Sequence, residues 1–181
     1  MTKLLLAVFL NLWVGWGTLR PFPNVTATVT VQIPSVGISD PWVGINTNNG
    51  GLVQVGLMDG EGWGGSAWWV SCQGSQVCGV GQNNSRSVGI GDRVRLGVAY
   101  LGHGTYRMSV WDISRGWDVW HFVHGYAAPY RDEWIVETQS FTTPNVTVRF
   151  ADPTNVGKSL TAYPNRYAGL CPVRPFVVAG C

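Results

Sequence analysis

Two glutamates stand four residues apart in the segment 132–137, which reads DEWIVE. Side chains of a β-strand alternate between its faces, so Glu133 and Glu137 are expected on one face, and Trp134 and Val136 on the other. Acidic residues in strands usually lie on a solvated face, so a solvent-exposed strand is the simpler interpretation. The alternative is that one of the two carboxylates performs acid–base chemistry.

A single polar side chain, Gln54, interrupts the apolar run 52–58 (LVQVGLM). A buried amide must find hydrogen-bond partners, so Gln54 is either an edge residue or a buried amide with a role. An amide carries both a donor and an acceptor and does not titrate, so it can hold a water molecule or stabilise a developing negative charge.

Several other chemistries find no support in the sequence. The net charge is +2 without a basic run, so no nucleic-acid partner is implied. No phosphate-binding loop or Ser-His-Asp spacing is present, and the histidines at 103, 121 and 124 fit exposed positions. The cysteine spacings do not fit a zinc site. We therefore expect neither a metal nor a cofactor.

The elements that would position these residues are strands. The chain has 181 residues, which suits one domain, and combines 24 glycines with many β-branched residues and no helical periodicity. This pattern predicts an all-β sandwich or barrel. Loops are expected at 72–87 and 126–132, with a less regular tail from 152. Strands are expected at 24–34, 42–46, 52–58, 66–71, 93–100, 106–112, 117–123 and 145–150.

Three features point to export. The start, residues 1–12, has a charged end and a short apolar stretch that is too brief to span a bilayer, so it is a short signal or an apolar segment kept as a first strand. The cysteines allow three pairings, of which the local ones, 72 with 78 and 171 with 181, are the simplest. The four cysteines are Cys72, Cys78, Cys171 and Cys181. The three glycosylation sequons begin at Asn24, Asn83 and Asn145.

Four segments in order resemble motifs of the glutamic peptidases, or eqolisins. The family patterns are "WVGID", "LQTG", "AWYEW" and "AEWIVE", and the chain has WVGIN at 42–46, VQVG at 53–56, AWWV at 67–70 and DEWIVE at 132–137. Residues 13–16 (WVGW) resemble the family's "NWAGY", which opens the mature enzyme. The resemblance covers most of the chain and places the peptidase-like domain at 13–181.

The resemblance implies a sandwich of two curved antiparallel sheets whose concave face binds a protein or peptide substrate. It also implies a Gln–Glu dyad that carries over to Gln54 and Glu137, with Glu133 as the competing candidate. The glutamate would take a proton from a water that attacks the scissile carbonyl, and Gln54 would stabilise the oxyanion. A carboxylic base suits an acidic operating pH. The resemblance thus predicts a secreted, monomeric acid endopeptidase without a stable membrane span.

The sequence departs from the family around the dyad. Asn46 stands where the family has an aspartate, and Met58 stands at a second such position, with Asp59 one residue later. A one-residue shift moves a side chain to the other face of a strand unless a bulge restores it. Val70 replaces a further acidic residue. These changes predict weaker catalysis, a changed pH optimum or loss of activity.

The tryptophans leave two further interpretations open. Trp42, Trp68 and Trp69 would either line the substrate groove or pack in the core. The chain could also be a non-catalytic exported β-sandwich, either a carbohydrate-binding module or a surface or filament subunit, because a fold does not fix a function. Gln54 and Glu137 side chains on different sheet faces, or far apart, would exclude the peptidase hypothesis.

Overall fold

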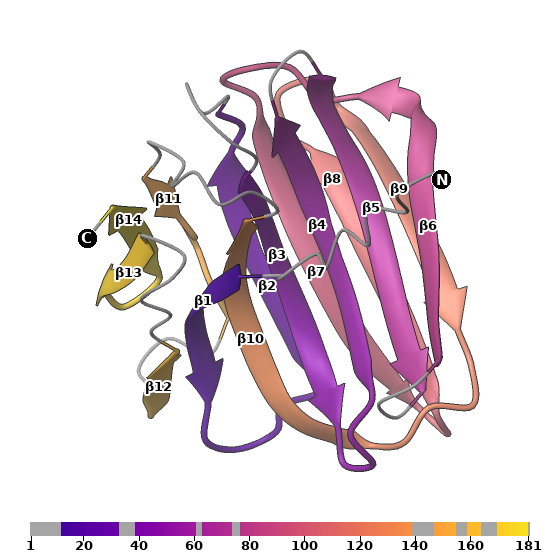
Figure 1. Ribbon diagram of the computed structural model, residues 1–181. Helices are drawn as coiled ribbons and strands as arrows, with labels where there is room; N and C mark the ends of the chain where they lie inside the picture. Colours follow the sequence, from indigo (N-terminus) through magenta and orange to yellow (C-terminus); the bar gives the residue numbers. More distant parts are fainter. Residues whose placement is uncertain are drawn as a thin grey trace, which may run out of the picture.

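The fold is a sandwich of two antiparallel sheets, with a third, small sheet at its side (Figure 1). The computed structural model describes residues 12–32, 39–60, 63–73, 77–138, 147–154, 159–163 and 170–180. All fourteen elements in these residues are strands, which confirms the all-β prediction. Residues 1–11, Asn145 and Cys181 lie outside the described residues, so the export segment and the third sequon stay predictions.

The first large sheet has seven strands in the order β12-β1-β10-β3-β4-β5-β6. Its strands come from both ends and the middle of the chain. They are β1 (Leu12–Thr18), β3 (Ser39–Thr47), β4 (Leu52–Gly60), β5 (Trp63–Gln73), β6 (Val77–Ser87), β10 (Pro129–Thr138) and β12 (Leu160–Tyr163). The segment that carries both glutamates, β10, therefore lies in the interior of this sheet, between β1 and β3.

The second large sheet has four strands in the order β2-β7-β8-β9, and the small sheet has three in the order β11-β14-β13. The four-stranded sheet contains β2 (Asn24–Thr30), β7 (Arg93–Gly102), β8 (Thr105–Asp112) and β9 (Trp117–Val123). The small sheet contains β11 (Val148–Arg149), β13 (Leu170–Arg174) and β14 (Val177–Gly180).

The main core lies between the two large sheets. Alternate residues of β3, β4 and β7 point into it and are valine, isoleucine or leucine, and β8 adds Tyr106, Met108 and Val110, as expected for strands with one face packed. Trp134 on β10 is fully buried there, and its indole Nε1 donates to the Thr26 carbonyl at 3.2 Å. Trp134 thus ties β10 to β2 on the opposite sheet, and it fixes which face of β10 points away from the core.

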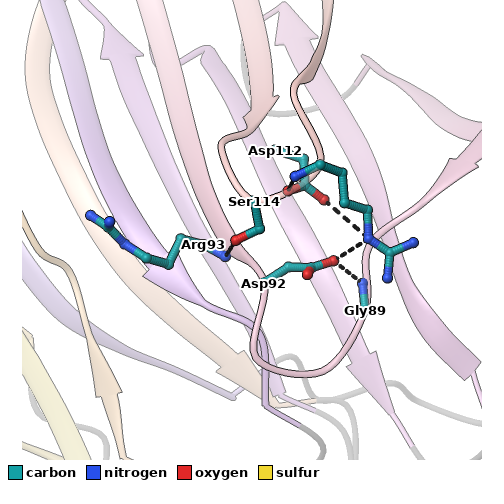
Figure 2. Close-up of polar contacts among 6 residues, drawn as sticks. Gly89, Asp92, Arg93, Asp112 and Ser114 are labelled. Carbon is teal, nitrogen blue, oxygen red and sulfur yellow. Dashed lines mark hydrogen bonds and ion pairs between the residues drawn. The ribbon is translucent and has the colours of Figure 1, made fainter.

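A polar cluster joins two turns at one end of the four-stranded sheet (Figure 2). The Asp92 carboxylate accepts hydrogen bonds from the Gly89 backbone and from Arg115 Nε, both at 2.5 Å. The Gly89 N–H lowers the pKa of Asp92 most, because it stabilises the charged form, and Arg115 adds to the effect. The cluster holds the start of β7 against the β8–β9 turn.

Three predicted irregular regions contain strands. Residues 72–87 were expected to form a loop, yet they hold the end of β5 and all of β6; residues 126–132 hold the start of β10; and the tail holds β12 to β14. These segments are polar or rich in glycine and proline, so their side chains do not alternate. Backbone hydrogen bonds to a neighbouring strand make these segments strands, and the local sequence does not show which strand that neighbour is.

Candidate active site

Glu133, Gly44 and Gln54 stand side by side on β10, β3 and β4. Residues directly opposite each other in antiparallel strands share a face. Two strand spacings put the Cα atoms of Glu133 and Gln54 about 9.6 Å apart. Between them Gly44 has no side chain, and a Cβ there would lie 3.0 Å from Trp42 Cζ3 and 3.1 Å from Gln54 Cβ. The edge of the Trp42 ring therefore lies over Gly44, and the carboxyl and the amide stand on the strands on either side of it. We call this side of the sheet the site face.

Both polar side chains on this row are buried. Gln54 is 6% exposed and Glu133 is 8% exposed. Within the described residues, Gln54 Oε1 has no hydrogen-bond partner, and neither has Trp68 Nε1 on the neighbouring strand β5. Buried polar atoms in proteins are nearly always paired. One acceptor and one donor on the site face thus have hydrogen bonds left to make with a bound molecule.

Burial raises the pKa of Glu133, because a charged carboxylate is poorly solvated there. Three neighbours oppose this effect: a hydrogen bond from Asn46, the positive charge of Arg131 and a hydrogen bond from Tyr163 lower the pKa in that order. Asn46 is the residue that replaces the family's aspartate. Its neutral amide lies beside Glu133 and stabilises the carboxylate, whereas a second carboxylate there would repel it.

Glu137 lies on the site face but away from Gln54. It is opposite Asp40 on β3 and Trp13 on β1, four residues along β10 from the row of Gln54, or roughly 13 Å. Its Oε2 accepts a hydrogen bond from Trp42 Nε1 at 3.2 Å. Burial raises its pKa, and this hydrogen bond lowers it. Both glutamates thus share a face with Gln54, but the register favours Glu133 over Glu137 as the partner of Gln54.

The three candidate tryptophans divide between the two faces. Trp42 and Trp68 form a buried cluster with Ile135 on the site face, where they cover Gly56: a Cβ on Gly56 would lie 2.6 Å from Trp68 Cζ2 and 2.7 Å from Trp42 Cβ. Trp69 points the other way, packs against the main core and stacks on His121 at 5.1 Å. The expectation that Trp69 lines the site is wrong, because adjacent residues of a strand point to opposite faces.

The other positions at which the chain departs from the family patterns lie on β4 and β5. Val70 on β5 is directly opposite Gln54 and is partly buried on the site face, so this end of the row is apolar. Asp59 is opposite Ser39, and the β4–β5 register shifts between Met58 and Gly60. The side chains of Met58 and Asp59 lie outside the described residues, so the supporting role of Asp59 stays a prediction.

The structure describes some of the predicted disulfide cysteines and glycosylation sites. Cys72 is disulfide-bonded, and Cys78 is directly opposite it in the β5–β6 pair. The predicted bridge between these two is compatible with that register. Asn24 begins β2 and is exposed, whereas the side chains of Asn83, Cys78 and Cys171 lie outside the described residues. Glycosylation therefore stays a prediction.

Sequence reasoning missed three residues of the site face. Arg131 precedes Glu133 by two positions, so strand alternation alone could have found it. Asp40 is buried opposite Glu137, but it lies before the predicted strand 42–46. Tyr163 stands in the tail, where no periodicity marked β12, so the sequence offered no signal for it. Among the residues described, no group of His, Cys, Asp and Glu could hold a metal ion. In the same part of the chain, no helix is long and apolar enough to cross a membrane.

Comparison with known proteins gives the fold. No family model and no curated sequence matches the chain. Scytalido-glutamic peptidase, solved with a peptide-based transition-state analogue, superposes with a TM-score of 0.71 at 18% identity, over 94% of this chain and 97% of that chain. SCP-B, an eqolisin solved with the tripeptide Ala-Ile-His, gives 0.69 at 18% over the same shares. Aspergilloglutamic peptidase from Aspergillus niger gives 0.59 at 16% identity, over 81% and 100%. The chain has the β-sandwich fold of the eqolisin peptidases.

Proposed function

We propose that this protein is a secreted acid endopeptidase whose dyad consists of Gln54 and Glu133. The observation that carries the proposal is the row in which these two side chains share one face, on the strands that flank Gly44. The eqolisin fold supports a peptidase-like function, and two structural neighbours were solved with peptide-like molecules, which supports a peptide substrate. Relative to the motif-based expectation, the proposal moves the base from Glu137 to Glu133.

In this mechanism the Glu133 carboxylate takes a proton from a bound water, and that water attacks the scissile carbonyl. The Gln54 amide donates an N–H to the oxyanion that develops, while its Oε1 can hold the water. Protonated Glu133 then passes its proton to the leaving amine, which completes hydrolysis without a covalent intermediate. Burial of both groups strengthens these interactions, because a low dielectric screens them less.

The proposed pH dependence follows from the base. Glu133 must be ionised to accept a proton from water, and burial raises its pKa above the ordinary glutamate value. Activity should therefore rise with pH through that raised pKa on the acidic limb. The neutral Asn46 stabilises the carboxylate instead of repelling it. Replacement of the family's aspartate thus offsets part of the shift that burial produces.

The role of Gln54 can be tested with an apolar substitution. Gln54→Leu removes both hydrogen-bonding groups and is expected to lower kcat/KM for cleavage of a denatured protein at pH 2–6 by about 10²–10³. The matched control is Gln73→Leu, because Gln73 is exposed at the end of β5. A wild-type protein that cleaves nothing in this range, or a Gln54→Leu variant with full activity, would exclude the mechanism.

A second candidate function rests on the outer face of the four-stranded sheet. Trp111 on β8 and Trp120 and Phe122 on β9 are 46%, 61% and 44% exposed. Register puts Trp120 opposite Ser109 and Phe122 opposite Arg107, so all three rings share the face turned away from the core. Exposed aromatic rings beside polar side chains suit stacking on sugar rings. This face therefore supports a carbohydrate-binding role, either instead of catalysis or beside it.

Retention on insoluble polysaccharides such as cellulose and chitin tests this role. If the face binds sugars, Trp120→Ala should weaken retention roughly five- to tenfold, because an aromatic stacking contact is worth about 1 kcal/mol. Tyr130→Ala is the control, since Tyr130 is 55% exposed but stands on β10 of the other sheet. Equal retention of both variants would argue against the outer face as a binding surface.

A further inference from the structure

Glu133 has a glycine on each side. Gly44 on β3 is opposite it on one side, and Gly17 on β1 is opposite it on the other. Above Gly44 lies the edge of the Trp42 ring, because a Cβ on Gly44 would be 3.0 Å from Trp42 Cζ3. Above Gly17 lies the ring of Tyr163, because a Cβ on Gly17 would be 2.7 Å from Tyr163 Cε2 and 2.9 Å from Cζ. Tyr163 stands on β12, at the edge of the sheet, and crosses β1 only because Gly17 has no side chain.

Arg131 reaches the same tyrosine from β10. It precedes Glu133 by two residues, so it shares the site face, and it is opposite Asn46 on β3. Arg131 Nη1 donates to the Tyr163 hydroxyl oxygen at 2.6 Å, and the guanidinium carbon lies 5.7 Å from the Tyr163 ring centroid. A guanidinium offers only donors, so the Tyr163 oxygen is the acceptor in this bond.

The direction of that bond decides what Tyr163 can offer Glu133. With its oxygen accepting from a cation, the phenol has its own hydrogen left to donate, and Glu133 is the neighbouring acceptor. Burial raises the pKa of Tyr163 to about 12, and the nearby Glu133 charge adds to this, so the phenol keeps its proton at acid and neutral pH. Arg131 thus donates a hydrogen bond to Tyr163, and Tyr163 has its hydrogen to donate to the Glu133 carboxylate.

We propose that Arg131 and Tyr163 are a positioning pair that orients the Glu133 carboxylate and favours its ionised form against the effect of burial. Their place is on the Gly17 side of Glu133, opposite the side on which Gln54 stands. The other polar groups that face Glu133 are Asn46 on β3 and Gln54 on β4, both neutral. Further along β10 and β3 stand Glu137 and Asp40, whose negative charges would oppose ionisation. The catalytic meaning of the pair rests on the proposed peptidase function, but its effect on Glu133 does not.

The test is a direct titration of Glu133. The chain has three glutamates, at positions 61, 133 and 137, so a protein labelled with [δ-13C]glutamate gives three carboxyl signals. Loss of one signal in Glu133→Gln assigns it. We expect Tyr163→Phe, which keeps the ring over Gly17, to raise the midpoint of Glu133 by about 0.5–1 unit, and Arg131→Met to raise it at least as much. The midpoint of Glu137 should move much less.

Activity gives a second, independent measurement. If the protein cleaves peptides, the acidic limb of the kcat/KM profile should move to higher pH together with the NMR midpoint of Glu133. Arg131→Lys should show a smaller shift than Arg131→Met. If the NMR midpoints shift as expected but no cleavage occurs, the peptidase function is excluded and the positioning role of Arg131 and Tyr163 stands. An unchanged Glu133 midpoint in Tyr163→Phe and in Arg131→Met would overturn the proposal, whatever the activity. Retained folding of Tyr163→Phe, seen in its circular dichroism, makes that outcome decisive.

Discussion

Glu133→Gln is expected to lower kcat/KM for peptide hydrolysis by about a thousandfold or more, because it removes the group that takes the proton from water. The substitution keeps the size and shape of the side chain, and an amide can still accept a hydrogen bond from Tyr163. The chemistry is therefore lost while the buried row with Gly44 and Gln54 stays in place. Initial rates on a denatured protein substrate between pH 2 and 6 measure the effect.

Glu137→Gln is the matched control, because it makes the same chemical change on the same strand and face. We expect it to change kcat/KM by less than about tenfold. The Glu137 carboxylate accepts a bond from Trp42 and stands opposite Asp40, roughly 13 Å along β10 from the row of Gln54. The reverse result, with Glu137→Gln inactive and Glu133→Gln active, would return the base to the position that the family motif indicates. Inactivity of both variants would require the two carboxylates to work together.

Asp132→Asn is expected to remove a large part of the pH dependence of stability. Asp132 is fully buried on the core-facing side of β10, next to Glu133 in sequence. Burial raises its pKa to about 8, and the neighbouring Glu133 charge adds to this, while a backbone hydrogen bond from Phe22 acts in the opposite direction. In the unfolded chain the carboxyl titrates near its ordinary value of about 3.9. Between these two values the folded state binds more protons than the unfolded state.

It follows that the contribution of Asp132 to stability is greatest below about pH 4 and is lost as the pH rises towards 8. The slope is about 1.4 kcal/mol per pH unit for one group, so the total is on the order of several kcal/mol. Glu133 and Glu137 contribute with the same sign, and Asp92, whose pKa is lowered, contributes with the opposite sign. The difference in the free energy of unfolding between the wild type and Asp132→Asn isolates the contribution of position 132.

Urea unfolding at pH 3, 5, 7 and 8 checks this prediction. The wild type should lose stability across the series, and Asp132→Asn should lose much less, so that the variant is the more stable protein at pH 8. Asp118→Asn, at an exposed position on β9, should follow the wild type. Parallel curves for the wild type and Asp132→Asn would show that Asp132 titrates alike in the folded and unfolded states. A fold that is most stable in acid would suit an enzyme that works there.

Much of the fold could be predicted from the sequence because it is locally encoded. Alternating residues predicted β7 and β8 close to their observed limits and the start of β2, which ends at Thr30 and before the predicted limit, and the apolar runs with turn residues predicted β3, β4 and β9. β6 and β12 could not be predicted, because their side chains do not alternate and only pairing with β5 and β1 makes them strands.

The sequence by itself determined which chemical groups the site could contain. It singled out Gln54, Glu133, Glu137 and Asn46, and strand alternation put the two glutamates on one face. Only the tertiary structure decided which glutamate stands beside Gln54, because the register between β10, β3 and β4 depends on residues far apart in the chain. It also brought Tyr163 to Glu133 across Gly17. A one-dimensional pattern fixes the face of a side chain, whereas its neighbours depend on how the strands align, and that alignment is set by the packed sheet as a whole.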